Sequence, residues 1–452
     1  MRRTSAAFAA LFVLLGAACQ STADAPRRRA AAPSAVDDLE RRTFRWFWDT
    51  ANPHTFLVPD RWPTKSFSSI AAVGFGLTAY CIGAERGYVT REQARDRVLS
   101  TLRSLLAMPQ GDQATGVTQY HGFFYHFLDM ETGVRYKDVE LSTIDTTWML
   151  AGALFCQSYF DRDDPAEKAI RDTAEQLYER TEWDWAQPRP PAITMGWYPE
   201  KGFHPYDWRG YNEGMMVIIL ALGSPTHPVD AAAWNEWTKT YRWGTFYGQE
   251  HLIFAPLFGH QYTQMFIDFR GIQDPYMRAH GIDYFENSRR ATISQRSYAI
   301  DNPGHWNDYG PNIWGLTACD GPGDATIDGR TYHSYTARGA TDGDIRDDGT
   351  IAPTAAASSM AFTPDISIAA IGEMQRKYGS KLYREYGFAD AFNPTYPNGW
   401  FDVDYLGIDQ GPIIAMVENY RSGLVWETMK KNPHVVRGLK RAGFGGGWLD
   451  QR

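Results

Sequence analysis

The sequence alternates between helical segments that are apolar on every side and helical segments with a single apolar stripe. Phe67 to Ala84 is apolar almost all round, as expected of a helix that other helices surround. Thr90 to Leu106 begins with a capping box and carries its leucines on one stripe, which is typical of a helix with one face in water. The other helical patterns are Asp37 to Trp48, Ile144 to Phe160, Asp164 to Arg180, Asn212 to Leu222, Asp230 to Trp243, Pro364 to Tyr378 and Ile413 to Lys430. This order of inner and outer helices predicts an all-α fold, an (α/α) toroid around one core.

The rest of the pattern agrees with one domain over residues 35–452. Strand and helix patterns do not alternate, and no Gly-rich phosphate loop precedes a helix, so a Rossmann unit is excluded. Strand-like runs near Val117 to Phe127 predict hairpins on the rim, and a long irregular middle separates Trp243 from Pro364. No shift in composition marks a second domain.

The first 19 residues have the features of a secretory signal peptide. Arg2 and Arg3 precede an apolar run that is too short to span a bilayer, and small residues lead up to Cys19. We favour a lipobox that ends at Cys19, which makes the mature chain an exported lipoprotein of the periplasm or outer membrane, in contact with the membrane only through its lipid. The alternative is cleavage after Ala23-Asp24-Ala25, which leaves a soluble periplasmic protein. Residues 20–34 are expected to form a flexible tether.

Composition limits the classes of molecule that the folded part could bind. The net charge is −8 and Lys and Arg form no stripe, so a nucleic-acid partner is excluded. Aromatic residues make up 14% of the chain, and their flat faces suit sugar rings. Cys81, Cys156 and Cys319 are expected to be buried free thiols, because three cysteines cannot all pair and no zinc spacing occurs.

Two segments place a carboxylate where an aromatic loop turns into an apolar helix. Glu140 and Asp145 flank the start of the helical pattern that follows Ser142, and Glu213 precedes the pattern that starts at Met215. Taken singly, each acid could simply complement a helix N-terminus. Taken together, they supply the acid and the base or nucleophile that glycosidic hydrolysis requires.

Further candidates lie in loops that combine Asn, Asp, His and aromatic residues. Such mixtures are suited to binding sugar hydroxyls, and a solvated loop is the alternative. No His spacing typical of a metal site and no Gly-x-Ser-x-Gly elbow occurs, so we expect neither a metal, nor another cofactor, nor a serine nucleophile. The substrate-binding candidates are Tyr120, His204, Tyr211, Asn212, His260, Gln261, Asp268, Arg270, Trp306, Tyr309, Asn312, Trp314, Asp409 and Glu418.

With these segments in view, the chain resembles the glucoamylase-like family of bacterial glycan enzymes, in particular the β-1,2-glucanases of glycoside hydrolase family 144. The resemblance extends from about Leu39 to Trp448. Its motifs are GFFYHFLDMETG, ELSTIDTTWMLAG, GYNEGMMVIILALGSPTHP, IDFRGI, YGPNIWGLTACDGP, DDGTIAPTAAASSMAFTP and GIDQGPIIAMVENYRSGLVW.

The resemblance implies an (α/α)6 barrel that hydrolyses β-1,2-glucan internally, with inversion and without a metal. It places the catalytic carboxylates at Asp145 and Glu213, with Glu140 also in the site, and does not assign acid and base between them. Cys319 and the segment His260 to Tyr262 depart from the family pattern, which leaves the substrate preference open.

Three alternatives stand beside this interpretation. The first is an exo-acting β-glucan hydrolase that releases sophorose or glucose. The second is a glycan-binding lipoprotein without catalysis, against which the presence of both acids argues. The third is a transglycosylase or a lyase on the same fold, although a lyase would need a cationic floor for uronates. The oligomeric state is open.

Overall fold

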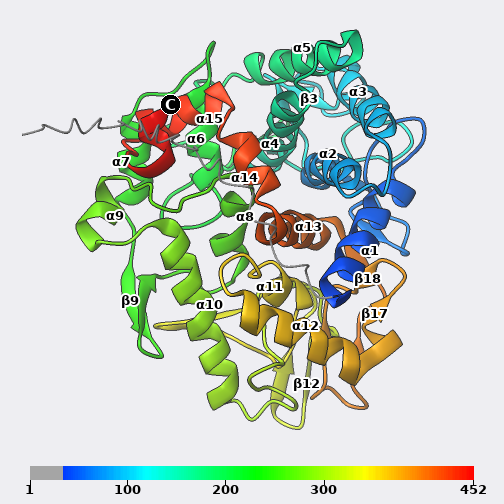
Figure 1. The fold of residues 1–452 in the computed structure, drawn as a ribbon, viewed down its shortest axis with the longest axis vertical. Helices are drawn as coiled ribbons and strands as arrows, with labels where there is room; N and C mark the ends of the chain where they lie inside the picture. Colours follow the sequence, from blue (N-terminus) through cyan, green and yellow to red (C-terminus); the bar gives the residue numbers. More distant parts are fainter. Residues whose placement is uncertain (1–33) are drawn as a thin grey trace, which may run out of the picture. The chain divides into compact units, whose positions relative to one another are not determined.

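The segments that are apolar on every side become helices that the rest of the chain surrounds. The computed structural model describes residues 34–452. Nearly every residue is buried in α2 (Ile70–Glu85), α4 (Thr143–Tyr159), α6 (Met215–Gly223) and α13 (Gly407–Arg421). These helices lie toward the middle of the view in Figure 1, and most of the helices with an exposed face lie outside them.

The remaining helices are shorter or carry a solvent-facing side. The capping box predicted at Thr90 is confirmed, because Thr90 Oγ1 accepts from Gln93 N at 3.1 Å and Gln93 Oε1 accepts from Thr90 N at 2.8 Å. These helices are α1 Ser34–Thr50, α3 Arg91–Ala107, α5 Pro165–Glu179, α7 Ala232–Thr238, α8 Phe258–Phe266, α9 Pro275–His280, α10 Tyr284–Asp301, α11 Pro353–Ala357, α12 Pro364–Tyr378, α14 Leu424–Met429, α15 Pro433–Arg441, and the 3-10 turns Gly379–Lys381 and Gly447–Gln451.

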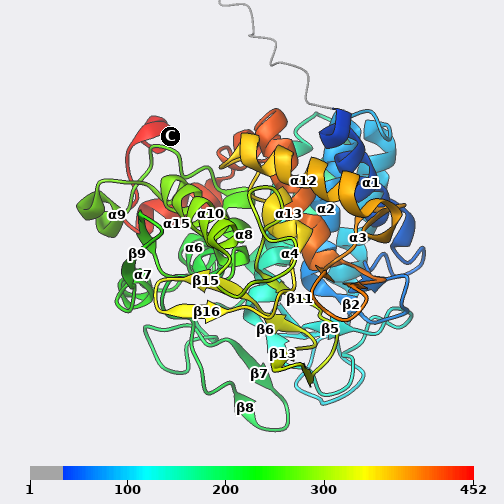
Figure 2. The same cartoon turned by 90° about the horizontal axis from the view of Figure 1, so that it is seen from below.

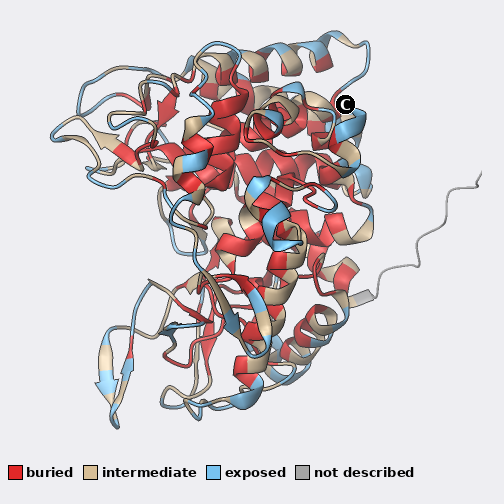
Figure 3. Ribbon diagram, turned by 90° about the vertical axis from the view of Figure 1, so that its left-hand side faces the viewer, coloured by how far each residue is buried: buried red, intermediate tan, exposed pale blue. Residues whose placement is uncertain are grey.

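The fold is mostly helical and not all-α as predicted, because it also contains short antiparallel hairpins. Figure 2 shows many of them gathered on one side of the helices, and Figure 3 shows that this side is less buried than the inner helices. The hairpin expected near Val117 to Phe127 is present as the pair β3 and β4. The strands are β1 Arg61–Trp62, β2 Ser68–Ser69, β3 Gln119–Tyr120, β4 Phe123–Phe124, β5 Phe127–Leu128, β6 Leu141–Ser142, β7 Gly196–Tyr198, β8 Gly202–Phe203, β9 Trp243–Phe246, β10 Gln249–Leu252, β11 Ala318–Cys319, β12 Ala325–Ile327, β13 Arg330–Tyr332, β14 Thr336–Ala337, β15 Gly339–Thr341, β16 Asp344–Arg346, β17 Tyr383–Arg384, β18 Gly387–Phe388, β19 Phe392–Asn393, β20 Trp400–Phe401 and β21 Tyr405–Leu406.

Two predicted helices have different bounds. The segment predicted from Asp230 to Trp243 ends as α7 at Thr238, because Trp243 starts β9, which turns at Tyr247 and Gly248, both at positive φ, into β10. The segment predicted from Ile413 to Lys430 is two helices, since α13 begins earlier and Gly423, at φ +75°, separates it from α14.

The sequence pattern predicted an irregular middle of the chain. This prediction is wrong, because the segment contains α8, α10 and α11. The contact between α8 and α10 is largely polar. Gln264 Nε2 donates to Ser288 Oγ at 2.5 Å, and Ser288 Oγ donates to the backbone oxygen of His260 at 2.8 Å. An interface of hydrogen-bonded polar side chains has no apolar period, so the helical pattern was not visible in the sequence.

The contact between α2 and α4 is apolar and brings the two backbones close together at glycines. A Cβ on Gly74 would lie 2.2 Å from the backbone oxygen of Trp148, and a Cβ on Gly152 would lie 2.1 Å from the backbone oxygen of Gly74. The two backbones therefore touch at these glycines. Further along the same contact, Cys81 Sγ and Cys156 Sγ are 3.6 Å apart. As predicted, both are buried free thiols, and so is Cys319.

The N-terminal predictions fall almost entirely outside the described residues. The signal peptide, the lipobox at Cys19 and residues 20–33 of the tether lie there, and Ser34 is the first residue of α1. Within residues 34–452, no helix has both the length and the apolarity needed to cross a bilayer.

Candidate active site

Three inner helices begin directly after a short strand. β2 leads into α2, β6 into α4 and β21 into α13, and each of these strands pairs with another strand on the hairpin side seen in Figure 2. Side chains in the first turns of the inner helices, and in the loops before them, are thus brought to one end of the helical layers.

Asp145 lies in the first turn of α4 and is only 8% exposed. Ser142 caps this helix, because its Oγ accepts from Asp145 N at 3.1 Å and donates to Asp145 Oδ2 at 2.5 Å. Burial raises the pKa of Asp145, although the charge of His126 and the Ser142 hydrogen bond oppose it. Asp145 thus has two roles: its backbone N–H takes part in the cap of α4, and its carboxylate is a candidate catalytic group.

His126, just before β5, stands between two carboxylates. Its Nδ1 is 2.8 Å from Glu140 Oε1, and its Nε2 is 3.5 Å from Asp145 Oδ2. Burial lowers the pKa of His126, but the charge of Asp145 and the hydrogen bond to Glu140 outweigh it and raise the pKa to about 9. His126 is therefore a cation at neutral pH, and its ring separates Glu140 from Asp145.

Glu213 lies in the turn that leads into α6 and has a different environment. Its Oε2 is buried without a hydrogen-bond partner among the described residues. Burial, together with the nearby charge of Asp145, raises the pKa of Glu213 to about 7. We refer to Glu140, Asp145, Glu213 and His126 as the Asp145 group.

Tyr262 of α8 lies among these acids. Its hydroxyl donates to the backbone oxygen of Ile408 at 2.6 Å, at the start of α13. Burial, followed by the charges of Asp409, Glu213 and Asp145, raises its pKa well above the usual value. The hydroxyl of Tyr262 thus lies within reach of acids from the starts of α4, α6 and α13.

A second set of acids lies at the start of α13. Asp409 is buried beside Asp390, and burial raises the pKa of Asp409 to about 7. One carboxylate oxygen each from Asp320, Asp390 and Asp402 lies within 4.8 Å of the others. We refer to Asp320, Asp390, Asp402 and Asp409 as the Asp390 group. The sequence shows no metal-ligand spacing, so it did not predict that Asp320, Asp390 and Asp402 lie close together.

Several predicted substrate-binding residues are part of the core. Tyr211 packs against Tyr284 at a ring separation of 6.0 Å, and Trp314 is fully buried. His260 is buried, and burial lowers its pKa to about 3. Gln261 donates to Ser359 Oγ at 2.9 Å. These side chains hold α8, α10 and α11 together, and their role in substrate binding stays a prediction.

Asn212 also has a local role. Its Oδ1 accepts from Gly214 N at 2.9 Å, which fixes the turn into α6. Asn212 therefore positions the backbone beside Glu213 and is not free to bind a sugar through that oxygen.

Three other candidates lie at the opposite ends of the inner helices. Glu418 is nine residues after Asp409 on α13, on the order of 13 Å along the helix, and binds Arg86 at 2.5 Å. Asp268 follows the C-terminus of α8 and is paired with Arg270 at 2.7 Å and with Lys430 at 2.8 Å. The charges of Glu418, Asp268 and Arg270 are satisfied in ion pairs at this end, so the structure does not bring them to Asp145 and Glu213, and their substrate binding stays a prediction.

The loop after α10 holds the next three candidates. Tyr309 Oη donates to Asp347 Oδ1 at 2.7 Å, and the Arg330 guanidinium lies 4.4 Å from the centre of the Trp306 ring. Asn312 is half-buried. These contacts stabilise the loop, and the substrate binding of its three residues stays a prediction.

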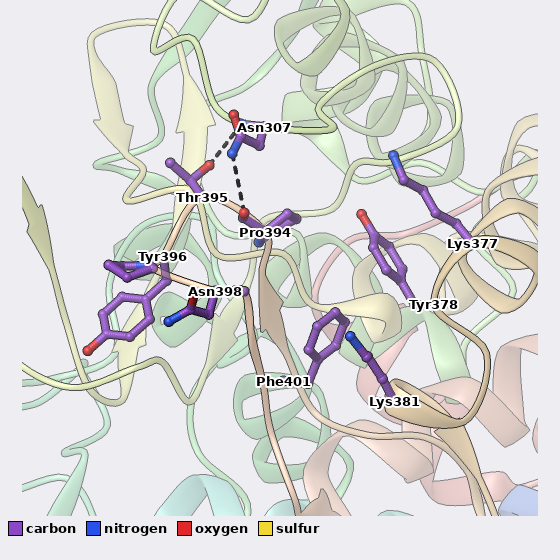
Figure 4. Close-up of a pocket in the computed structure, with 11 residues that line it drawn as sticks. Asn307, Lys377, Tyr378, Lys381, Pro394, Thr395, Tyr396, Asn398 and Phe401 are labelled. Atoms are coloured by element: carbon purple, nitrogen blue, oxygen red, sulfur yellow. Dashed lines mark hydrogen bonds between the residues drawn. The ribbon is translucent and has the colours of Figure 1, made fainter.

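A separate pocket of about 470 Å3 lies between α12 and the β19–β20 hairpin. Figure 4 shows Lys377, Tyr378 and Lys381 on one side of it and Asn307 held by Thr395 and Pro394 on the other. None of the described residues that line it is a carboxylate, so this pocket cannot supply an acid and base pair.

The two remaining candidates lie on the hairpin side near α4. His204 is close enough to Glu140 for its charge to lower the pKa of that acid, which His126 also lowers against the effect of burial. Tyr120 packs against Trp197 of β7 at a ring separation of 5.1 Å, next to β6. Tyr120 and His204 thus lie on the side of α4 where the Asp145 group is located.

Three site residues, His126, Asp320 and Asp390, were not selected from the sequence, and Tyr262 was noted only as part of the segment His260 to Tyr262. His126 lies in the motif GFFYHFLDMETG, where it is a single polar residue among aromatics. Asp320 and Asp390 are isolated in sequence from each other and from Asp402. Their only shared signal is that each lies beside a short strand.

Comparison with known proteins identifies the family. Residues 205–433 match the family described as "Putative glucoamylase", and the chain belongs to this family. The crystal structure of a putative glucoamylase from Bacteroides uniformis ATCC 8492 is similar, with a TM-score of 0.82 and 32% identity over 93% of this chain and 100% of that chain.

Two relatives carry names that state an activity. The endo-beta-1,2-glucanase of Chitinophaga pinensis, solved as a complex with sophorotriose and glucose, has a TM-score of 0.81 and 31% identity over 93% of this chain and 100% of that chain. An exo beta-1,2-glucooligosaccharide sophorohydrolase (non-reducing end) of Parabacteroides distasonis is 30% identical over 441 residues, which is 90% of this chain. The chain spans 57% of the length of that relative.

Proposed function

We propose that this protein is a glycoside hydrolase that cleaves β-1,2-glucan, with Glu213 as the general acid and Asp145 as the general base. The observation that carries the proposal is the contrast between these neighbouring carboxyls. Glu213 has a pKa of about 7 and an unpartnered buried oxygen, whereas Asp145 faces a histidine cation and accepts a hydrogen bond from Ser142.

The contrast supports this assignment of acid and base. A general acid must carry a proton near the working pH. Glu213 Oε2 has no described hydrogen-bond partner, and burial outweighs the backbone hydrogen bond that favours the ionised form of Glu213. A general base must be ionised. Burial raises the pKa of Asp145, but His126 and Ser142 oppose that shift by favouring the charged form, whereas Glu213 has no such side-chain partner among the described residues. Glu213 would protonate the leaving glycosidic oxygen, and Asp145 would take a proton from the attacking water.

The position of His126 argues against the pair Glu140 and Asp145 as the reacting acids. The imidazole binds one carboxylate at each nitrogen and fills the space between them. Glu140 is thereby a positioning residue, which holds His126 and through it Asp145.

The substrate class rests on the relatives whose names state an activity. Both act on β-1,2-linked glucose chains, one as an endo enzyme and one as an exo enzyme that releases sophorose. We propose endo action as the main function, and exo action with release of sophorose or glucose as the alternative.

We also infer that the two helical layers close into an (α/α)6 barrel. Support comes from six inner helices, α2, α4, α6, α8, α11 and α13, each followed in sequence by a helix of another layer or edge. A crystal structure in which these layers stay open would contradict this inference.

We propose further that the chain is exported and anchored by lipid at Cys19, on the basis of its first 19 residues. Cell fractionation of the wild type and of Cys19→Ala tests this. Export without membrane association in both proteins would favour cleavage after Ala25 instead.

The activity is tested by incubating the protein with linear β-1,2-glucan and resolving products over time. Endo action yields a range of oligosaccharides at the earliest times, and exo action yields only sophorose or glucose. A protein that binds the glucan in affinity electrophoresis but forms no product would be a glycan-binding protein, and the proposal would be wrong.

A matched control is available in Glu182. It pairs with His121 at 2.7 Å, as Glu140 pairs with His126, but it follows α5 and is not part of the Asp145 group. Glu182→Gln should retain activity, whereas Glu213→Gln should not.

A further inference from the structure

Three aspartates from separate segments converge at the hairpin end of α13. Asp320 follows β11, Asp390 precedes β19 and Asp402 follows β20. The β19–β20 pairing sets Asp390 and Asp402 at the base of one hairpin, and Asp320 is attached to it because Asp320 N donates to Asp390 Oδ2 at 2.7 Å. One oxygen from each carboxylate lies within 4.8 Å of the other two.

The convergence leaves buried oxygens without partners. Asp390 and Asp402 are 1% and 7% exposed, and Asp390 Oδ1 and Asp402 Oδ2 accept no hydrogen bond from any described residue. Their other oxygens are taken, since Asp402 Oδ1 accepts from Asp404 N at 3.0 Å and Asp390 Oδ2 is bound as above. Asp402 therefore presents one free oxygen, and apart from Asp320 N the side chain of Asp390 has only the carboxyl of Asp409 within hydrogen-bond reach among the described residues. Buried carboxylates without a cationic partner are costly.

Side-chain cations of the described chain do not balance this charge. Arg61 binds Asp320 at 2.7 Å and Asp60 at 3.1 Å, which commits its charge to those two acids. Arg338 and Arg384 approach the backbone oxygens of Asp320 and Asp402, at 3.3 and 3.0 Å, rather than their carboxylates. Asp390 and Asp402 are left without a cation.

We propose that Asp320, Asp390 and Asp402 bind a calcium ion. Three carboxylates without nitrogen or sulfur ligands suit a hard cation, and ligands on irregular loops suit the flexible coordination of Ca2+ better than the strict octahedron of Mg2+. The ion would join the loop after β11 to the β19–β20 hairpin, beside Asp409 in the first turn of α13.

This site is independent of the proposed hydrolysis, because none of its ligands belongs to the Asp145 group. The competing explanation is that the acids are protonated and hydrogen-bond to sugar hydroxyls or to one another. The two explanations differ in a glucan-free sample, where only the first predicts binding of a cation.

The test is calcium binding by the full chain after treatment with EDTA and removal of the chelator. Titration calorimetry without glucan should show one ion bound per chain, and Tm should rise by at least about 3 °C in 1 mM CaCl2, as expected for a ligand that binds only the folded state. Mg2+ should bind at least about tenfold more weakly. An absence of binding heat together with an unchanged Tm would overturn the proposal.

Asp402→Asn should lose the calcium-dependent rise in Tm. The matched control is Asp328→Asn, an exposed turn residue between β12 and β13 at φ 50°, where asparagine is tolerated. The control should keep the full rise, and an equal rise in both variants would overturn the assignment.

A wild-type measurement covers the case in which Asp402→Asn fails to fold. Tb3+ has coordination chemistry like that of Ca2+, and Trp400 lies two residues from Asp402. Excitation of tryptophan should produce Tb3+ luminescence that CaCl2 displaces. Luminescence that calcium does not displace would contradict a calcium site.

Discussion

The Asp145 group and the Asp390 group lie at the same end of the inner helices, but their charges are arranged in opposite ways. In the Asp145 group a histidine cation lies between two acids, and Glu213 stands apart with a pKa of about 7. In the Asp390 group, Arg61 pairs with Asp320, whereas Asp390 and Asp402 face each other without a described cation of their own. The first arrangement contains the proposed acid and base, and in the second the proposed calcium ion would balance the charge of the buried carboxylates.

The largest effect should come from removing the reacting carboxyls. Glu213→Gln and Asp145→Asn should each lower kcat/KM on linear β-1,2-glucan by at least about a hundredfold, the usual contribution of a general acid or base. Calorimetry should show little change in Tm for Glu213→Gln, since its Oε2 has no described partner. Variants that keep most of their activity would refute the assignment, and unfolding of Asp145→Asn would favour a purely structural role in the helix cap.

The stereochemical result should be complete inversion. If Asp145 and Glu213 act from different inner helices, a water enters between the base and the sugar, the geometry of carboxyls about 6.5 to 9.5 Å apart. NMR of the anomeric proton in the first minutes should show the α-anomer. An initial β-anomer would indicate a covalent intermediate and a closer pair of acids.

His126→Gln should lower kcat/KM by about tenfold. Without the cation, the pKa of Asp145 rises, and one pKa unit corresponds to about a tenfold change in equilibrium. The pH profile distinguishes this from damage to the fold, because the acidic limb of kcat/KM should move to higher pH. His121→Gln, at the equivalent pair with Glu182, should leave the limb in place.

The pH dependence of stability should also differ between wild type and Glu213→Gln. Burial raises the pKa of Glu213 from its usual 4.5 to about 7, so the folded state keeps a proton that the unfolded chain has lost. Wild-type stability should therefore decrease as pH rises from about 4.5 to 7, and the variant should lack this decrease. Urea unfolding at pH 4, 6 and 8 measures it, and parallel curves would show that Glu213 is not desolvated.

Chelation should have the smallest effect on catalysis and so separate the two groups. EDTA should lower Tm through the Asp390 group, while kcat/KM at 25 °C should change by less than about twofold, because no ligand of the proposed ion belongs to the Asp145 group. A large loss of activity without a change in Tm would mean that a metal takes part in the reaction itself.

The helices that pack through apolar side chains were predictable, and those that pack through polar side chains were not. α2 and α4 are visible as apolar segments, whereas α8 and α10 bury Gln264, Ser288 and His260 in hydrogen bonds that leave no hydrophobic period. The sequence also did not show at which end of a buried helix an acidic residue lies. Asp409 and Glu418 both lie in an apolar helix, and only the structure shows that Glu418 is at the end that binds Arg86.

Residues that act through neighbours were also invisible. His126 gains its role from Glu140 and Asp145, which follow it at different distances along the chain, and Asp320, Asp390 and Asp402 meet only after three loops are folded. Motifs identified the acids of α4 and α6 because those lie at helix starts. They could not identify contacts set by hairpin register.

The glycine contact between α2 and α4 has a consequence for how this chain can change over generations. A methyl group at Gly74 or Gly152 would overlap a backbone atom, which no rearrangement of side chains can relieve. In a library of random variants selected only for folding, both positions should remain glycine, while neighbouring buried positions exchange one aliphatic residue for another. At these two positions, the backbone oxygens of Trp148 and Gly74 therefore decide which residues α2 and α4 accept, and the volume available in the core does not.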